Sequence, residues 1–228
     1  MQWQTQTADY SYGKDLAVDR NKVLRNTYLL LALTMIPTTI GALIGVSMHF
    51  MLRGWVGPLL FLGVSFGAFF AIEKTKQSAL GVVLLLAYTG FMGLWLSQYL
   101  QVALRFGNGG QLIATAAGGT AAIFFTLAGI ATVTKKDFSF MGKFLFVGMV
   151  ILLLAAIANI FLAIPALTLT ISAVAVLIFS AYILYDVSQI VNGGQTNYVS
   201  ATLQLYLDIY NVFVSLLNLL MAFSGDRE

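Results

Sequence analysis

Two aspartates, Asp186 and Asp208, stand in stretches that otherwise consist mostly of apolar residues. Asp186 lies in "SAYILYDVSQI" and Asp208 lies in "LYLDIYNVF". A charged side chain in the centre of a membrane costs about 3 kcal/mol or more, so such a residue is by default a functional candidate. Two carboxylates in contact cannot both ionise cheaply, and the pair is expected to share one proton. The residue types therefore indicate a pH sensor or a site for a cation that prefers oxygen ligands.

Calcium is one cation that such a pair could hold. Ca²⁺ takes about 6–8 oxygen ligands in proteins. The two aspartates, with help from Gln189, Gln204 or backbone carbonyls, supply only part of that set. We therefore expect Ca²⁺ to occupy the pair transiently on a conduction path, and we expect no tightly held metal and no resident cofactor.

A polar stripe accompanies the second aspartate. Its five members are spaced four and three residues apart, so they share one helix face. They are Gln204, Asp208, Asn211, Ser215 and Asn218. Tyr182 and Gln189 continue the pattern more weakly around Asp186. A stripe of this kind cannot face lipid without unmet hydrogen bonds, so it must face other helices or water. For the uncharged members, a structural hydrogen-bonded seam and a functional path are both open.

The composition of the chain shows in which solvent these residues lie. Of the 228 residues, 59% are hydrophobic and 9% are charged, whereas a soluble domain has about 25% charged residues. So few charges cannot cover a surface that faces water, which makes the lipid bilayer the main solvent. The chain has no cysteine, which excludes disulfides and thiol chemistry, and its single histidine, His49, ends an apolar run and is a poor metal site.

Seven apolar runs are each close to the length of about 20 residues that a membrane-spanning helix needs. They cover residues 28–50, 55–72, 79–102, 111–133, 144–163, 166–191 and 201–223. The first 26 residues are polar and charged and lack the short apolar core of a signal peptide. We therefore divide the chain into a polar segment, 1–26, and a seven-helix domain, 27–228. The division at Pro165 is the least secure, because a proline can also kink a single helix.

Lysine and arginine predict the orientation of these spans. With the N-terminus in the cytoplasm, nine of them fall on the cytoplasmic side and three on the other side, as the positive-inside rule requires. The nine are Lys14, Arg20, Lys22, Arg25, Lys74, Lys76, Lys135, Lys136 and Lys143, and the three are Arg53, Arg105 and Arg227. Because the cations form short clusters between apolar runs, they indicate membrane orientation and not nucleic-acid binding.

The helix order also places the two aspartates. The sixth and seventh spans are antiparallel and are joined by a short turn, so they are expected to be neighbours. At 1.5 Å per residue, Asp186 lies about 8 Å and Asp208 about 12 Å from the same end. We predict that the two carboxyl groups face each other near the cytoplasmic side. Pairs of small residues, Gly41 with Gly45 and Gly63 with Gly67, predict close helix packing elsewhere.

These stretches resemble the Bax inhibitor-1 family, also called the transmembrane Bax inhibitor motif family. The resemblance covers all seven spans and is sharpest in "TKKDFSF", "ANIFL", "SAYILYDVSQI" and "LYLDIYNVF". Three further stretches, "KVLRNTY", "GGTAAIFF" and "NGGQTNYVSATLQLYL", are similar to the bacterial branch that modulates the membrane protease FtsH. The resemblance implies an all-α bundle in the bacterial inner membrane, with six helices around the seventh.

The resemblance implies two activities. In the modulator branch, the protein binds FtsH and restrains its proteolysis of membrane proteins, and the exposed N-terminal segment takes part. In members with a paired aspartate, the protein is a pH-sensitive calcium leak, and Asp186 and Asp208 match those two positions. Leak members also have an arginine near the end of the second helix that can latch to the pair. Here "FFAIEKTKQSAL" offers only Lys74 and Lys76 as a possible latch, and lysine lacks the planar fork of arginine.

An intramembrane aspartyl protease is the third interpretation. Tyr185 precedes Asp186 as it does in such proteases, but "LYLD" lacks the glycines that usually precede the second acid. A "PAL" triplet at 165–167 comes before both acids and not after them. We therefore expect no enzymatic activity and no catalytic residues. Regulation of FtsH is the leading hypothesis, and a pH-gated cation leak is the alternative.

Overall fold

The structure is a computed structural model that describes residues 2–52, 54 and 56–225, with side chains from Arg20 onwards. Over these residues it contains seven α-helices and no strand. The helices are α1 (Gln2–Ser47), α2 (Val56–Thr75), α3 (Ala79–Ala103), α4 (Gly109–Thr134), α5 (Gly142–Leu162), α6 (Pro165–Asn192) and α7 (Tyr198–Gly225), and a short 3₁₀ turn, η1 (Ser139–Met141), precedes α5. All seven are long and apolar enough to cross a membrane, which confirms the predicted bundle.

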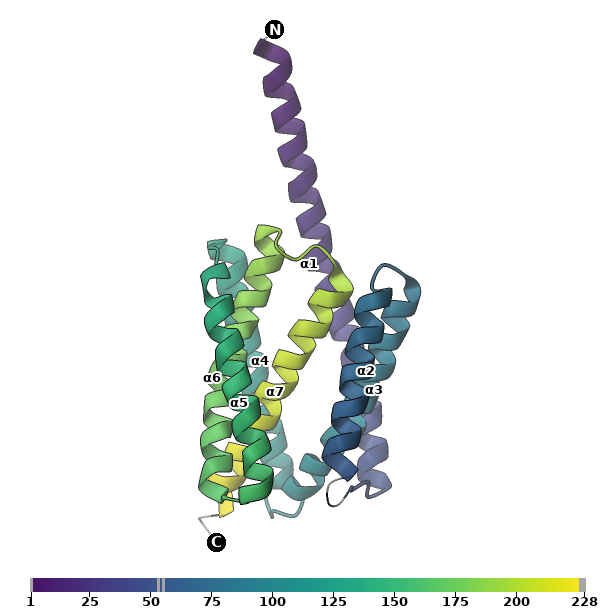
Figure 1. Ribbon diagram of the computed structural model, residues 1–228, viewed down its shortest axis with the longest axis vertical. Helices are drawn as coiled ribbons and strands as arrows, with labels where there is room; N and C mark the ends of the chain where they lie inside the picture. The colour runs from purple at the N-terminus through teal and green to yellow at the C-terminus, as the bar shows by residue number, and fades with distance from the viewer. Residues whose placement is uncertain (1, 53, 55, 226–228) are drawn as a thin grey trace.

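Helix α1 is much longer than the apolar run that predicted it. The segment that is long and apolar enough to span a membrane lies within Arg20–Ser47, and the polar residues before it continue the same helix without a break. Figure 1 shows this first part projecting well beyond the ends of the other helices. The polar N-terminal segment is therefore presented outside the bundle as an extension of the first span.

The division at Pro165 is confirmed. Ala163 has a left-handed conformation with φ 49° and ends α5, Ile164 is extended, and Pro165 begins α6. Proline suits the first position of a helix because its missing N–H would have no partner there. The Asn159 side chain accepts a hydrogen bond from the Ile164 N–H at 3.0 Å and donates one to the Thr168 hydroxyl at 2.7 Å. Two helices and a capped turn therefore stand where a kinked single helix was the alternative.

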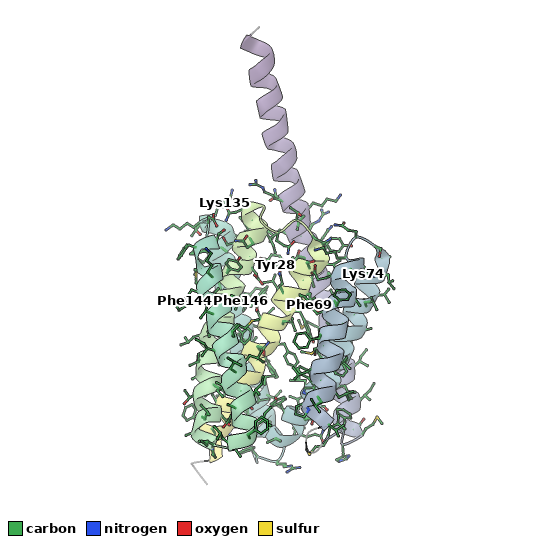
Figure 2. All side chains as sticks on the ribbon, in the orientation of Figure 1. Tyr28, Phe69, Lys74, Lys135, Phe144 and Phe146 are labelled. Atoms are coloured by element: carbon green, nitrogen blue, oxygen red, sulfur yellow. The ribbon has the colours of Figure 1, made fainter. Side chains whose placement is uncertain are left out.

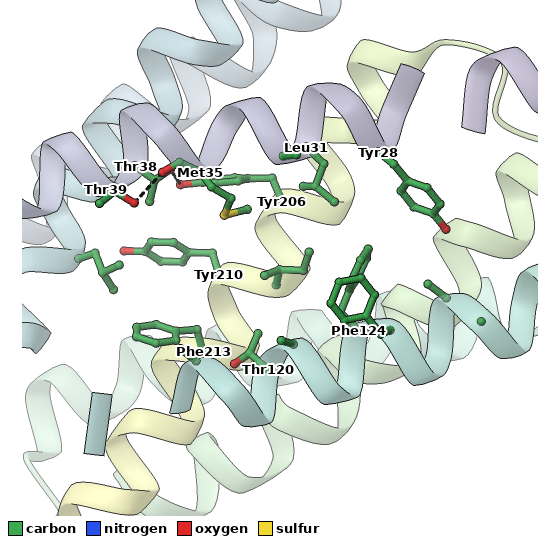
Figure 3. Close-up of a pocket in the computed structure, with 18 of the residues that line it drawn as sticks. Tyr28, Leu31, Met35, Thr38, Thr39, Thr120, Phe124, Tyr206, Tyr210 and Phe213 are labelled. Atoms are coloured by element: carbon green, nitrogen blue, oxygen red, sulfur yellow. Dashed lines mark hydrogen bonds between the residues drawn. The ribbon is translucent and has the colours of Figure 1, made fainter. Parts of the chain in front are cut away.

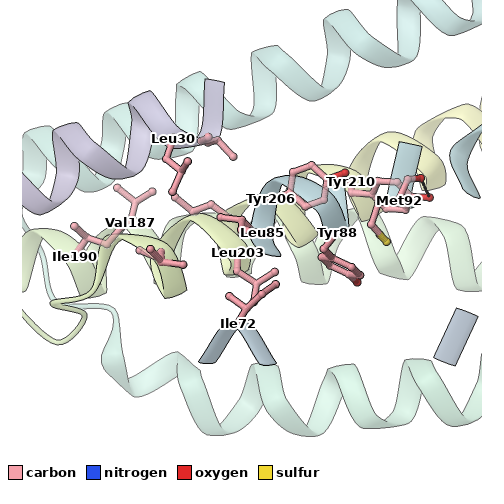
Figure 4. Packing of buried hydrophobic residues seen from close by; sticks show 14 of the residues in the cluster. Leu30, Ile72, Leu85, Tyr88, Met92, Val187, Ile190, Leu203, Tyr206 and Tyr210 are labelled. Carbon is pink, nitrogen blue, oxygen red and sulfur yellow. Dashed lines mark hydrogen bonds between the residues drawn. The ribbon is translucent and has the colours of Figure 1, made fainter. Parts of the chain in front are cut away.

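Helix α7 lies at the centre of the bundle. It crosses the molecule obliquely (Figure 1) and packs against α1, α2, α3, α4 and α6. Its first turns are buried on every side, because five successive residues from Val199 to Leu203 are all buried. Figure 4 shows Leu203, Tyr206 and Tyr210 of α7 within the main apolar cluster. The central position of the seventh helix is thus confirmed, but within the described residues five helices contact it, because α5 packs on α6 and not on α7.

Glycine permits close packing between α1 and α3 but not at both predicted pairs. A Cβ atom on Gly41 would collide with the backbone of Gly90, and one on Gly45 would collide with Ser97. These two glycines therefore let the helices approach closely, as predicted. The prediction was wrong for Gly63 and Gly67, around which no atom lies within 4 Å of an added Cβ. Their spacing is correct, but this face of α2 is turned away from the other helices.

Candidate functional site: the aspartate pair of the α6–α7 hairpin

The turn between α6 and α7 fixes the relative height of the two acids. Gly193 ends α6 with φ 82°, a left-handed conformation that favours glycine. Asn197 then caps the first turn of α7, because its Oδ1 accepts hydrogen bonds from the N–H groups of Val199 at 2.9 Å and Ser200 at 3.0 Å. The Asn197 Nδ2 also donates to the Lys76 carbonyl at 3.0 Å. The turn is thus capped on both sides, at the end of α6 and at the beginning of α7, and it is hydrogen-bonded to the α2–α3 connection.

Asp186 and Asp208 meet as predicted. Both are buried, with 8% and 6% of their surfaces exposed, and their carboxyl groups are close enough to influence each other electrostatically. The Asp208 Oδ2 atom is buried and makes no hydrogen bond. In the part of the chain that the structure describes, neither acid forms an ion pair with a lysine or arginine. Two carboxyl groups in such contact are stable together when they share a proton.

Aromatic side chains of α6 lie beside the acids. Tyr182 is close enough to interact electrostatically with both carboxyl groups, and Tyr185 is close enough to interact with Asp186. The two tyrosine rings make an edge contact with centroids 6.3 Å apart. Tyr185 also packs against Gly142, where an added Cβ would lie 2.9 Å from its hydroxyl. Tyr182 thus lies near the two acids, and Tyr185 contacts both Tyr182 and the beginning of α5.

The connection from α4 to α5 is hydrogen-bonded to the C-terminal end of α6, which is the end nearest the acids. The Ser188 hydroxyl donates to the Lys136 carbonyl at 3.0 Å and accepts from the Phe138 N–H at 3.1 Å. Asn192 donates to the same Lys136 carbonyl at 3.1 Å. Inside the connection, hydrogen bonds from the Ser139 hydroxyl and backbone N–H lower the pKa of the exposed Asp137 carboxyl. The motif "TKKDFSF" therefore forms a strap across the end of α6.

Three other residues of the predicted polar set form hydrogen bonds with groups other than the acids. Gln189 donates to the Ser139 hydroxyl at 2.8 Å, on the strap. Gln204 is exposed and accepts from Gln195 at 3.2 Å. Asn211 donates to the Leu207 carbonyl of its own helix at 2.8 Å, and Ser215 is buried further along α7. Tyr182 thus interacts with the pair, whereas the hydrogen bonds of Gln189, Gln204 and Asn211 go to other groups.

The two lysines that could form a latch lie at the end of α2. Lys76 pairs with Glu73, with 2.7 Å between Lys76 Nζ and Glu73 Oε2. The Lys74 side chain is exposed, and Figure 2 shows it at the same end of the bundle as Lys135 and the N-terminal extension. In this conformation, the described residues include no lysine latch on the aspartates.

The pair offers a cation few ligands. Among the residues that the structure describes, no three His, Cys, Asp or Glu side chains cluster as a metal site. Two carboxyl groups supply fewer oxygens than the 6–8 that Ca²⁺ takes. The two carboxyl groups alone therefore leave part of a Ca²⁺ coordination shell unfilled.

Sequence reasoning missed the residues that hold the hairpin and the strap. Ser188 and Asn192 are four residues apart on α6, a spacing that places them on one helix face. Asn197 directly precedes a helical run, which is a recognised position for a helix-capping side chain. Both signals were present in the sequence, but they became informative only when the strap was seen to lie against α6.

Comparison with known proteins agrees with this architecture. Residues 20–225 match the family model described as inhibitor of apoptosis-promoting Bax1. The chain belongs to the Bax inhibitor-1 family. Within this family it is 41% identical over 216 residues to a protein of Escherichia coli named modulator of FtsH protease YccA, a match that covers 95% of this chain and 97% of the relative.

The names of two further relatives indicate where the chain is located. A protein of a second Escherichia coli strain is named inner membrane protein YccA. It is also 41% identical over 216 residues, which cover 95% of this chain and 97% of its own. An uncharacterized membrane protein of Vibrio cholerae is 40% identical over 207 residues, which cover 89% of this chain and 90% of its own. With its seven spanning helices, the chain is a multi-pass inner-membrane protein.

Proposed function

We propose that the protein is a non-enzymatic inner-membrane regulator that restrains proteolysis by FtsH. The observation that carries this proposal is the identity of 41%, over almost the full length of both chains, to a protein named modulator of FtsH protease. The projecting part of α1 supports it, because a polar helix outside the bundle offers a partner a surface free of lipid.

Arg20 gives this N-terminal helix a connection to the aspartate hairpin. Its guanidinium group lies over the turn at Gly193, where an added Cβ would be 2.8 Å from Arg20 Nε. A cation at this position is favourable because the C-terminal end of a helix carries partial negative charge. A partner that binds the N-terminal part of α1 would therefore act next to the turn that sets the height of the two acids.

Deletion of residues 2–19 tests the regulatory function. We expect the shortened protein to insert normally but to release FtsH, so that the half-life of an FtsH membrane substrate falls several-fold, towards its value in cells without the protein. A variant in which residues 2–19 are shuffled keeps length and charge and serves as the control for sequence recognition. An unchanged half-life after deletion would refute the role of this segment.

The proposal requires the N-terminal end of the bundle to face the cytoplasm. The nine-to-three distribution of lysine and arginine supports this orientation. A reporter fused after Glu228 should report the outer face of the membrane, and one fused after Gln77 should report the cytoplasm. A cytoplasmic signal from the C-terminal fusion would contradict the orientation.

A pH-gated cation leak is the second candidate function, and the contact between Asp186 and Asp208 favours it. A cation that passes the pair would compete with the shared proton, so flux would depend on pH. We expect Asp186→Asn and Asp208→Asn each to abolish the difference in Ca²⁺ entry into liposomes between acidic and alkaline pH. The double variant should add little, because the two acids act as one unit.

The exposed Asp137 provides a matched control for this measurement. Asp137→Asn removes one acid near the same end of the bundle but leaves the pair intact, so it should keep the pH response of the wild type. If both single variants of the pair also keep that response, the leak function fails, and regulation of FtsH stands alone.

A further inference from the structure

A cavity of about 830 Å³ lies between α1 and α4, and one side of α7 forms part of its wall. Figure 3 shows Met35 of α1, Phe124 of α4 and Phe213 of α7 around it. The described parts of α1 and α4 do not pack against each other along their backbones. They meet through Tyr28 and Phe124, whose ring centroids are 6.0 Å apart. We call this cavity the α1–α4 groove; neither aspartate lines it.

The wall of the groove is apolar even where it contains hydroxyl groups. Thr39 donates to Met35, Thr120 donates to Ala116 and Thr132 donates to Ala128, in each case to a carbonyl of its own helix. The Thr38 and Tyr206 hydroxyls are 2.9 Å apart and bond to each other. The Tyr28 hydroxyl, at one end of the groove, makes no hydrogen bond. Because the other hydroxyl groups are already satisfied, an occupant of the groove meets mainly hydrocarbon and aromatic surface beyond Tyr28.

The groove is at least as long as one leaflet of a bilayer. At 1.5 Å per residue, it extends about 16 Å on α1, from Tyr28 to Thr39, and about 24 Å on α4, from Ala117 to Val133. The hydrocarbon core of a bilayer is about 30 Å thick, so one leaflet is about 15 Å. An acyl chain that enters at the Tyr28 end would therefore find the groove open over the full depth of its leaflet.

Cations flank the entrance of the groove at the Tyr28 end. Arg25 lies less than one helical turn before Tyr28, and Lys135 follows Val133, the last lining residue of α4. Both cations are exposed, and no described residue forms an ion pair with either. Basic residues between membrane helices at this depth are suited to lipid phosphate groups.

We propose that the α1–α4 groove binds an anionic glycerophospholipid, with an acyl chain along α7 and the head group between Arg25 and Lys135. A transmembrane helix of a partner fits less well. A helix that spans the hydrocarbon core is about 30 Å long, whereas the groove covers only about 16 Å of α1 and about 24 Å of α4. The apolar wall, a length sufficient for an acyl chain and the charge at one end all match a phospholipid.

The wild-type protein can be tested directly with a photoreactive lipid. The probe is phosphatidylglycerol with a diazirine in its acyl chain, present as a trace in phosphatidylcholine vesicles that contain the full chain. After irradiation, peptide mapping should find several-fold more label at Met35, Phe124 and Phe213 than at the outward residues Phe144 and Ile151 of α5. Equal labelling of groove and α5 would overturn the proposal.

Neighbouring alanines provide a matched pair of variants. Ala121 lines the groove, whereas Ala122, which is also exposed, does not. Ala121→Trp should reduce labelling of the groove several-fold, and Ala122→Trp should leave it unchanged. Equal loss in both variants would mean that the label reports general lipid contact. A photocrosslinker at position 121 that captures a protein helix from native membranes would show another occupant and would overturn the proposal.

Charge selection is tested by a second pair of variants. Combined Arg25→Gln and Lys135→Gln should remove the preference of the groove for phosphatidylglycerol over a phosphatidylcholine probe with the same chains. Combined Lys74→Gln and Lys143→Gln removes the same charge from the same end of the bundle and should keep that preference. A preference that survives the first pair would exclude the proposed position of the head group.

Discussion

Helices α5 and α7 occupy opposite positions in the bundle, since α5 lies at its surface and α7 lies in its interior. Of the seven helices, α5 has the most apolar spanning segment and α7 the least apolar one. Among its residues, α5 buries only Leu145, whereas α7 buries residues along its whole length, including Asp208 and Ser215. The more apolar helix is thus the outer one. Lipid is as apolar as leucine, so polar residues in this protein are a better sign of the interior than hydrophobic ones.

Truncation of a large side chain should give the clearest difference in stability between the two helices. Tyr206 of α7 is 1% exposed and Phe146 of α5 is 61% exposed. We expect Tyr206→Ala to destabilise the protein by about 3–5 kcal/mol, because it opens a cavity in the core. Phe146→Ala removes a side chain that faces lipid and should change stability by less than about 1 kcal/mol. Unfolding in mixed micelles would measure both.

A conservative variant would sharpen the first comparison. Tyr206→Phe keeps the ring but removes the hydroxyl that bonds to Thr38, which should cost about 1 kcal/mol. If Tyr206→Ala and Phe146→Ala had equal effects, the ring of Tyr206 would not be part of a closely packed core, and the central position of α7 would be in doubt.

The strap across α6 gives the next largest expected effect. Ser188→Ala leaves the Phe138 N–H without its acceptor, which should cost about 1–3 kcal/mol. Thr170 also lies on α6, but it is exposed and donates only to the Ala166 carbonyl of its own helix. Thr170→Ala should therefore change stability by about 0.5 kcal/mol or less. Similar unfolding curves for the two variants would show that the strap does not stabilise the bundle.

The helix count and the meeting of the acids followed from the sequence, because both depend on local rules. Length and apolarity define a span, and a short turn makes α6 and α7 neighbours, which brings Asp186 to Asp208. The direction in which each helix face points depends on all neighbours at once. Gly63 and Gly67 have the spacing of a packing motif, but they face open space because no helix covers that side of α2.

The partners of the polar residues were the least predictable part of the site. Gln189 shares a helix with Asp186 but turns towards Ser139 on the strap. No pattern within α6 shows where the α4–α5 connection lies, because that contact joins residues 50 positions apart in the chain. The α1–α4 groove is a similar case, since it exists only because α1 and α4 both pack on α7 and leave a space between them.

Asp137, at the entrance to α5, should give the smallest effect. It is exposed, and hydrogen bonds from Ser139 lower its pKa below the usual 3.8. A carboxyl group whose pKa is lower in the folded state stabilises the protein above its unfolded pKa, and this stabilisation is lost as pH falls through the folded pKa. In Asp137→Asn, a neutral amide oxygen can still accept the Ser139 bonds. The variant should therefore melt slightly below the wild type at neutral pH, and the two melting temperatures should converge below pH 3.8. A difference that stayed constant across that range would mean that the charge of Asp137 does not stabilise the turn into α5, which would then be held by the neutral bonds of the strap alone.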